Sequence, residues 1–134
     1  MIIVDTNVIA GLWLPCAHTE LAERAARKDP EWVTPHLWRS EFRNLLAGLV
    51  QQQQVPLELA FRLVEEAETF LARHECPVPA KKVMQLAATS GCSASDCEFV
   101  ALAMELDVPL VSTNAAVLKK FPGIAVSLES FVAG

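Results

Sequence analysis

Short apolar runs alternate along the chain with longer segments in which apolar residues recur at helical spacing. The runs are rich in Ile, Val and Leu and carry no polar residues between them, which is typical of strands buried on both faces of a sheet. Strands are predicted at residues 2–4, 32–34, 76–78, 109–112 and 124–127. Helices are predicted at 8–14, 19–28, 35–52, 56–74, 81–89, from Ser93 or Ser95 to 106, at 114–120, and as a final turn at 128–132. This alternation predicts an α/β fold with a parallel sheet covered by helices.

The two longest predicted helices follow each other directly. Pro35 and Pro56 each stand where a helix is expected to open, a position that suits proline because its missing N–H is not needed there. Only the polar stretch Gln51–Gln54 separates the two segments. We therefore expect the two helices to form an antiparallel hairpin.

Two of the apolar strands end in polar residues. The strand at 2–4 leads directly into Asp5, Thr6 and Asn7, and the strand at 109–112 ends in Ser112, Thr113 and Asn114. In parallel α/β sheets, ligands bind just beyond the carboxyl ends of the strands. Both groups of oxygen-bearing side chains are therefore expected at the edge where such a protein carries out its chemistry.

Two predicted helices carry an acid on their apolar face. Glu41 falls in the first stripe and Asp96 in the second, whereas Glu98 is spaced so that it points elsewhere. The stripes comprise Trp38, Glu41, Leu45 and Leu49, and Asp96, Phe99, Val100 and Ala103. Either acid alone is compatible with a place at the rim of the stripe, and a first-turn carboxylate such as Asp96 is also favoured by the helix dipole. Together with Asp5, however, they indicate a shared anionic pocket, since acids are seldom buried unless paired or bound to metal.

Three carboxylates in one pocket repel each other unless a cation neutralises them. A ligand set made only of oxygen atoms selects hard ions, so the expected cofactor is Mg²⁺ or Mn²⁺. Such ions keep bound water and take phosphate oxygens as ligands. The chemistry that this pattern indicates is phosphodiester hydrolysis.

The ordered set of motifs resembles the PIN-domain ribonuclease family, in particular the VapC-like toxins of type II toxin–antitoxin pairs. The matching segments are Ile3-Val4-Asp5-Thr6-Asn7-Val8-Ile9, Glu41, Ser95-Asp96-Cys97-Glu98-Phe99-Val100-Ala101-Leu102-Ala103, and Pro109-Leu110-Val111-Ser112-Thr113-Asn114. They occur in the family's order and span nearly the whole chain. The resemblance implies a single PIN-like domain over residues 1–134, built as a three-layer α/β/α sandwich with a protruding helical hairpin.

The same resemblance implies an activity and partners. It implies a Mg²⁺- or Mn²⁺-dependent endoribonuclease that acts on RNA, in which Asp5, Glu41 and Asp96 hold the metal. It also implies a homodimer and a cognate antitoxin that binds across the active-site groove. Asn114 is expected as a fourth ligand but departs from the family, which usually has Asp there. Asn keeps one carbonyl oxygen and removes a negative charge, so weaker metal binding is expected.

Several neighbouring residues have auxiliary candidate roles. Thr6 and Asn7 are candidates either to cap the following helix or to hydrogen-bond the site carboxylates. Ser112 and Thr113 either orient a metal-bound water or simply end their strand. Arg39 and Arg43 flank Glu41 and are weak candidates for contacts with the RNA backbone, with an ordinary surface role as the alternative.

Composition limits the partners and the compartment. The chain has 134 residues, a hydrophobic fraction of 52% and a net charge of −5, which fits one domain and argues against a broad electrostatic grip on nucleic acid. No apolar run reaches the roughly 20 residues of a membrane helix, and no signal peptide is evident, so a cytoplasmic protein is expected. The four cysteines form no C-x-x-C pair and are expected to be reduced and buried.

Three alternative functions use the same features. The first is a non-catalytic PIN-like module that binds RNA or protein with a weakened metal site, which Asn114 favours. The second, a receiver-like signalling domain, needs a second acid beside Asp5, where Thr6 stands instead. The third, a haloacid-dehalogenase-like phosphatase, needs an acid at the position of Asn7.

Overall fold

A five-stranded parallel sheet forms the centre of the computed structural model, which describes residues 1–134. The strand order is β3-β2-β1-β4-β5, and every neighbouring pair is parallel. The strands are β1 (Ile2–Val4), β2 (Trp32–Pro35), β3 (Glu75–Cys76), β4 (Leu110–Ser112) and β5 (Ala125–Ser127). The helices are α1 (Thr6–Trp13), α2 (Thr19–Lys28), α3 (Leu37–Gln51), α4 (Leu57–Leu71), α5 (Ala80–Ser90), α6 (Ala94–Leu106), α7 (Ala115–Lys120) and α8 (Leu128–Ala133). The predicted parallel α/β fold is confirmed.

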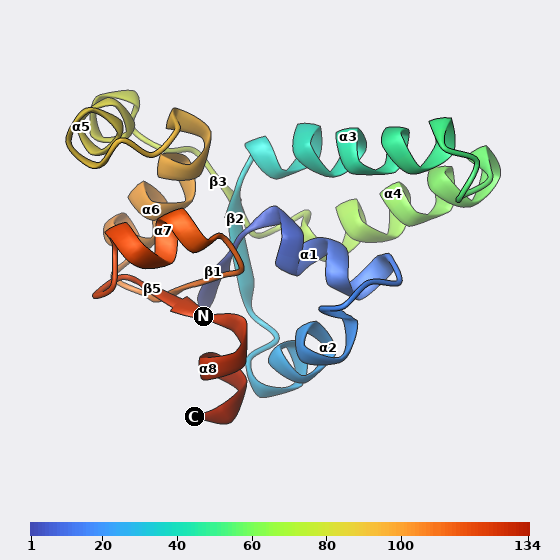
Figure 1. Ribbon diagram of the computed structural model, residues 1–134, viewed down its shortest axis with the longest axis horizontal. Coiled ribbons are helices and arrows are strands. Elements are labelled where there is room, and N and C mark those ends of the chain that lie inside the picture. The colour runs from blue at the N-terminus through green and yellow to red at the C-terminus, as the bar shows by residue number, and fades with distance from the viewer.

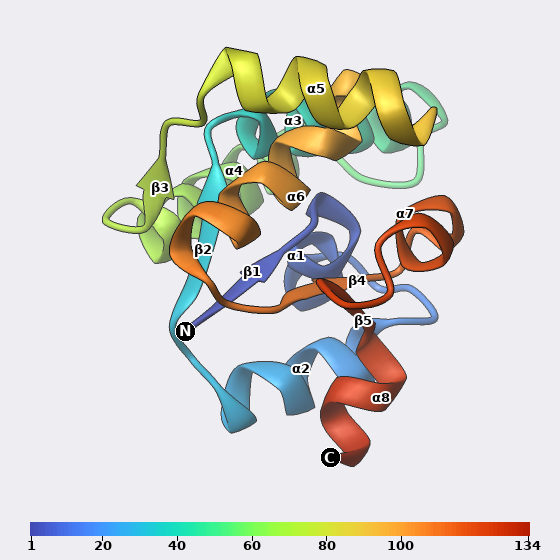
Figure 2. The same cartoon turned by 90° about the vertical axis from the view of Figure 1, so that its left-hand side faces the viewer.

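Helices cover both faces of the sheet, so the molecule has three layers (Figure 1). Strand β1 is apolar throughout because both of its faces are packed against helices. Ile2 and Val4 pack into one cluster with residues of α1, α2, α3, α4 and α8, whereas Ile3 packs into another with residues of α6 and α7. Helix α5 lies outside α6, against which it packs (Figure 2). The sheet therefore needs apolar side chains on both faces.

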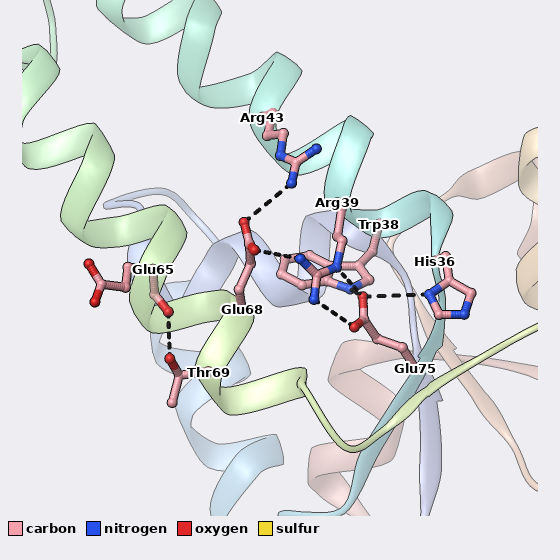
Figure 3. Close-up of polar contacts among 8 residues, drawn as sticks. All are labelled: His36, Trp38, Arg39, Arg43, Glu65, Glu68, Thr69 and Glu75. Atoms are coloured by element: carbon pink, nitrogen blue, oxygen red, sulfur yellow. Dashed lines mark hydrogen bonds and ion pairs between the residues drawn. The ribbon is translucent and has the colours of Figure 1, made fainter.

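The pair α3 and α4 forms the expected hairpin and extends away from the sheet (Figure 1). A polar network at its base joins the hairpin to β3 (Figure 3). The Glu75 carboxylate accepts hydrogen bonds from Arg39 Nε at 2.6 Å and Nη2 at 2.8 Å, and from Trp38 Nε1 at 2.6 Å. Arg39 Nη1 also donates to Glu68 of α4. These contacts join the base of α3 to β3 and to α4.

Some predicted boundaries are wrong, for local reasons. Pro35 does not open α3 but ends β2, and the helix starts at Leu37. Helix α1 starts at Thr6 rather than at residue 8, since Asp5 accepts a hydrogen bond from the Val8 amide and caps the helix. Pro56 does stand at a helix start, as the N-cap residue of α4.

The four cysteines differ in their burial. None of the four cysteines forms a disulfide, but only Cys92 and Cys97 are buried, and Cys16 is exposed. No helix combines the length and the apolar character needed to cross a bilayer.

Candidate functional site

The candidate site lies where the order of the strands changes direction. From β1 the chain first adds β2 and β3 on one side, and then β4 and β5 on the other. In open α/β sheets, ligand sites form at the carboxyl end of the sheet at such a point. A cavity of about 200 Å³ opens there. Its lining is Asp5, Thr6, Asn7, Glu41, Asn44, Leu45, Asp96, Phe99, Leu110, Ser112, Asn114 and Val117.

Asp5 is held at the end of β1 by three hydrogen bonds. Its Oδ1 accepts from the Val8 amide at 3.1 Å. Its Oδ2 accepts from Ser112 Oγ at 2.6 Å and from the Thr113 amide at 3.1 Å. Burial raises the pKa of Asp5 above its usual range, the hydrogen bonds oppose that shift, and the nearby charge of Asp96 adds to it. A half-buried carboxylate, held by three hydrogen bonds, is therefore presented to the cavity.

Glu41 approaches the cavity from α3. Thr6 Oγ1 of α1 donates a hydrogen bond to Glu41 Oε1 of α3 at 2.6 Å. This contact fixes the orientation of the Glu41 carboxylate. Burial raises the pKa of Glu41, the hydrogen bond from Thr6 opposes the shift, and the charges of Asp96, Asp5 and Glu98 add to it. Glu98 itself does not line the cavity, as its spacing predicts.

The predicted apolar stripe around Glu41 is partly wrong. The fully buried face of α3 consists of Trp38, Phe42 and Leu46, whereas Leu45 is 38% exposed. Trp38 belongs to both faces, and the buried face is rotated from the predicted one by roughly 50°, about half the angle between successive residues. Glu41 stands at its edge, where one side of the helix meets the core and the other meets the cavity.

Asp96 reaches the cavity from the first turn of α6. Ser93 is one of the two predicted caps. Its Oγ accepts a hydrogen bond from the Asp96 amide at 3.0 Å and caps the start of the helix. The helix is buried on most sides from Phe99 to Ala103 rather than along one stripe, because α5 covers its outer face. Asp96 is only partly buried and remains open to the cavity.

Asn114 follows β4 and lines the same cavity. Its Oδ1 accepts hydrogen bonds from the amides of Ala116 at 3.0 Å and Val117 at 3.3 Å. The oxygen that was expected to bind metal therefore caps α7. Ser112 also has a clearer role than expected, because its hydroxyl donates to Asp5 and accepts from the Asn114 amide at 2.9 Å.

Comparison with known proteins identifies the family. The family model described as PIN domain matches residues 2–123. The chain belongs to the PIN-domain family. It is 29% identical over 126 residues to "Ribonuclease VapC3" of Pyrobaculum aerophilum. The aligned segment covers 92% of this chain and 96% of that protein.

Two solved structures share the fold of this PIN domain. The crystal structure of PAE2754 from Pyrobaculum aerophilum has a TM-score of 0.78 at 20% identity and covers 98% of this chain and 93% of that one. A toxin–antitoxin complex from Klebsiella pneumoniae has a TM-score of 0.67 at 16% identity and covers 96% of this chain and 98% of that one. The predicted PIN-like fold is confirmed.

The PIN domain has cavity residues that sequence reasoning did not single out. Asn44 lies on α3 three residues after Glu41, about one helical turn along the same side, and lines the cavity. That spacing was the available signal. Thr6 hydrogen-bonds a site carboxylate and does not cap α1, whereas Asn7 is exposed on the cavity wall.

The structure does not bring Arg39 or Arg43 to the cavity of this PIN domain. Arg39 is paired with Glu75 and Glu68, and Arg43 Nη2 lies 3.5 Å from Glu68 (Figure 3). These contacts hold the hairpin, so Arg39 has a structural role. No Lys, Arg or His side chain lines the cavity at all.

The donor set of the PIN domain fits a hard divalent ion by its chemistry. The three acidic side chains of the cavity offer only oxygen atoms as ligands. The pKa values of Asp5 and Glu41 are raised, and a bound cation would lower them. No three His, Cys, Asp or Glu side chains are gathered closely enough to hold an ion by themselves. Mg²⁺ is commonly held by one or two carboxylates, with water and substrate phosphates as its other ligands. The arrangement fits such a partial shell and not a closed cage.

Proposed function

We propose that this protein is a Mg²⁺- or Mn²⁺-dependent endoribonuclease and the toxin of a type II toxin–antitoxin pair, acting in the cytoplasm. One observation carries the proposal: carboxylates from β1, α3 and α6 share one cavity at the carboxyl end of the sheet. The printed name of the relative, a ribonuclease, and the neighbour's toxin–antitoxin complex support this class of activity.

Asp5, Glu41 and Asp96 are the proposed metal-holding residues. A bound ion supplies Lewis acidity that activates water and offsets charge on a phosphodiester. The chain's own contribution is orientation. Ser112 and the Thr113 amide fix the Asp5 carboxylate, and Thr6 fixes that of Glu41. Supporting hydrogen bonds of this kind orient metal ligands and tune their basicity.

The charge of the cavity predicts that RNA binding requires the ion. Three carboxylates line the cavity and no basic side chain balances them, so a bare phosphodiester would be repelled. Substrate binding is therefore expected to depend on the divalent ion. We expect little affinity for RNA in EDTA.

The test is cleavage of single-stranded RNA in Mn²⁺ or Mg²⁺ by the wild type and by Asp5→Asn. We expect cleavage in the wild type and a loss of at least about 100-fold in the variant, the scale that a key electrostatic group contributes. Glu58→Gln is the matched control, since it removes an exposed acid from α4, outside the cavity. Cleavage that survives Asp5→Asn would contradict the metal site.

The proposed partners are a cognate antitoxin and a second copy of this chain. The hairpin carries a groove of about 280 Å³, lined by Arg43, Leu46, Ala47, Val50, Gln51, Leu57, Ala60, Phe61 and Val64. Leu57 is 54% and Phe61 57% exposed. Exposed apolar surfaces of this kind mark partner sites. Light scattering of the pure chain, and of the chain co-expressed with the product of a short neighbouring reading frame, tests both partners; a monomer that binds no such product contradicts them.

A second candidate function is a non-catalytic PIN domain that binds RNA or protein. The observation that favours it is Asn114, whose amide replaces an acid. Calorimetric titration with millimolar Mg²⁺ or Mn²⁺ distinguishes the two functions. An absence of binding favours the non-catalytic function.

A further inference from the structure

The side chain of Asn114 has a defined orientation. Both backbone groups that contact its outer end, the amides of Ala116 and Val117, are donors. The atom facing them must be the carbonyl oxygen, because an NH₂ group has no lone pair to accept with. That oxygen has two lone pairs, and two donors use them.

The other polar atom of Asn114 is Nδ2, a donor that makes no hydrogen bond within the chain. Asn114 lines the cavity together with Asp5 and Asp96. With its carbonyl committed to α7, the side chain has only N–H groups left for a ligand. A donor cannot coordinate a cation, and its positive end is repelled by one.

The remaining lone pairs suffice for one ion. Asp5 Oδ2 already accepts two hydrogen bonds and its Oδ1 one. Glu41 Oε1 accepts one from Thr6, which leaves Oε2 without a partner. Asp96 keeps both oxygens, since no protein donor reaches them. These free positions are the carboxylate oxygens open to an ion completed by water and phosphate, and the tip of β4 adds no acceptor to them, because the Asn114 carbonyl is committed to α7.

We propose that Asn114 restricts the cavity to one divalent ion and donates its amide hydrogen bond to a phosphodiester oxygen of the RNA. This inference rests on the proposed function of the same site. The cavity has no basic side chain, so a neutral donor at the tip of β4 is well placed to contact a phosphate without repelling the metal-holding acids.

Two substitutions separate the roles of Asn114. Asn114→Asp keeps a capping oxygen and exchanges the donor for a second carboxylate oxygen. Asn114→Ser keeps a capping oxygen, adds no charge and takes the donor away from the position of Nδ2, because its single hydrogen lies on the capping hydroxyl itself. Thermal melting in EDTA checks that both variants fold, and Asp5→Asn serves as the metal-site control.

The first measurement is calorimetric titration with Mn²⁺ in the absence of RNA. We expect one ion per chain in the wild type and in Asn114→Ser. In Asn114→Asp we expect a second ion, or binding at least about tenfold tighter, because a unit charge close to the ion is added. Two ions in the wild type, or an Asn114→Asp titration identical to the wild type, would overturn the inference alone.

The second measurement is the KM for single-stranded RNA at saturating Mn²⁺. We expect Asn114→Ser to raise KM about tenfold, the scale of one hydrogen bond to a charged group. An unchanged KM overturns the donor role. If wild-type protein binds no Mn²⁺ and cleaves no RNA, the proposed function fails and the inference fails with it.

Discussion

At the scale of single residues, the site depends on groups that hold the carboxylates in place. Asp5 accepts three hydrogen bonds and Glu41 one, and every donor comes from a residue of α1 or of the end of β4. The charge of Asp96 adds to the raised pKa of Asp5, and the charges of Asp96 and Asp5 add to the raised pKa of Glu41, although burial is the larger cause of both shifts. The surrounding backbone and hydroxyl donors therefore fix the orientation of the Asp5 and Glu41 carboxylates.

Thr6→Val tests this support at Glu41. Valine keeps the shape of threonine and removes the 2.6 Å hydrogen bond from Oγ1 to Glu41 Oε1. We expect metal affinity or RNA cleavage to fall about 10- to 100-fold, the range found when a group that orients a metal ligand is lost. Calorimetry and cleavage rates measure the effect. Thr6→Ser restores the donor and should restore both values; a Thr6→Val protein with wild-type metal binding would contradict the orienting role.

Asn114→Ala tests the cap of α7. Alanine leaves the amides of Ala116 and Val117 without their acceptor, so we expect the free energy of unfolding to fall by about 1 kcal/mol. Urea denaturation in EDTA measures the change, with Asn114→Ser as the control that keeps a capping oxygen. Equal stability of the alanine and serine variants would show that the cap contributes nothing.

At the scale of elements, α3 carries two separate functions on two sides. One side presents Glu41 and Asn44 to the cavity, and another presents Arg39 to Glu75 and Glu68. Arg39 and Glu41 are only two residues apart, yet about 200° separates them around the helix. This explains why an arginine that is adjacent to a site acid in sequence is not adjacent to it in space.

The Arg39–Glu75 pair predicts a pH dependence of stability. The hydrogen bonds from Arg39 hold the pKa of Glu75 below its usual range, and its side chain is only 6% exposed. A carboxyl with a lowered folded pKa stabilises the fold above its unfolded pKa of about 4.3, and this contribution is lost as the pH falls through the folded value. In Glu75→Gln, we expect the stability deficit relative to wild type to be full at pH 7 and to shrink below about pH 4. Denaturation at a series of pH values measures it, and a deficit independent of pH contradicts the ion pair.

Arg39→Met separates structure from RNA binding at the same pair. Methionine preserves packing and removes the charge, so we expect a loss of about 2 kcal/mol in stability. The KM for RNA is expected to stay at the wild-type value, since Arg39 lies outside the cavity. An increase in KM without a loss of stability would restore the alternative role as an RNA contact.

At the scale of the whole molecule, the site exists because strands distant in sequence are neighbours. β1 and β4 are paired, with Val4 opposite Val111, and this pairing places Asp5 beside Ser112, 107 residues further along the chain. Helices α3 and α6 then bring Glu41 and Asp96 in from above the same edge. The site is assembled from distant segments only in the folded chain, so binding at the site is coupled to the stability of the fold.

This coupling predicts stabilisation by metal. An ion that binds the folded chain and not the unfolded one should raise the free energy of unfolding by about 2.7 kcal/mol at a concentration 100 times its Kd. Thermal or urea denaturation with Mn²⁺ measures the shift. Asp5→Asn should show a much smaller shift, and an equal shift in both proteins would place the ion elsewhere.

Much of the fold follows from local pattern. The sequence predicted the strands β1 and β4, the extent of α2 and the hairpin of α3 and α4. It did so because buried segments have apolar residues at the spacing of a strand or a helix. The stripe on α3 was misplaced by about half a residue step around the helix, since Leu45 is as apolar as Leu46 and only packing distinguishes them. The cap at Asn114 was within reach of the sequence, because Asn directly before a helix commonly has that role.

By itself, the amino-acid sequence determined which segments are buried, that the sheet is parallel, and which acids break an apolar pattern. The spacing of apolar residues reflects the burial of each segment, so these features can be inferred from the sequence alone. Only the tertiary structure decided that the acids of β1, α3 and α6 share a cavity, that Arg39 pairs with Glu75, and that nothing basic lines the site. Those facts depend on strand order and on the rotation of each helix about its axis, which are set by contacts between residues far apart in the chain.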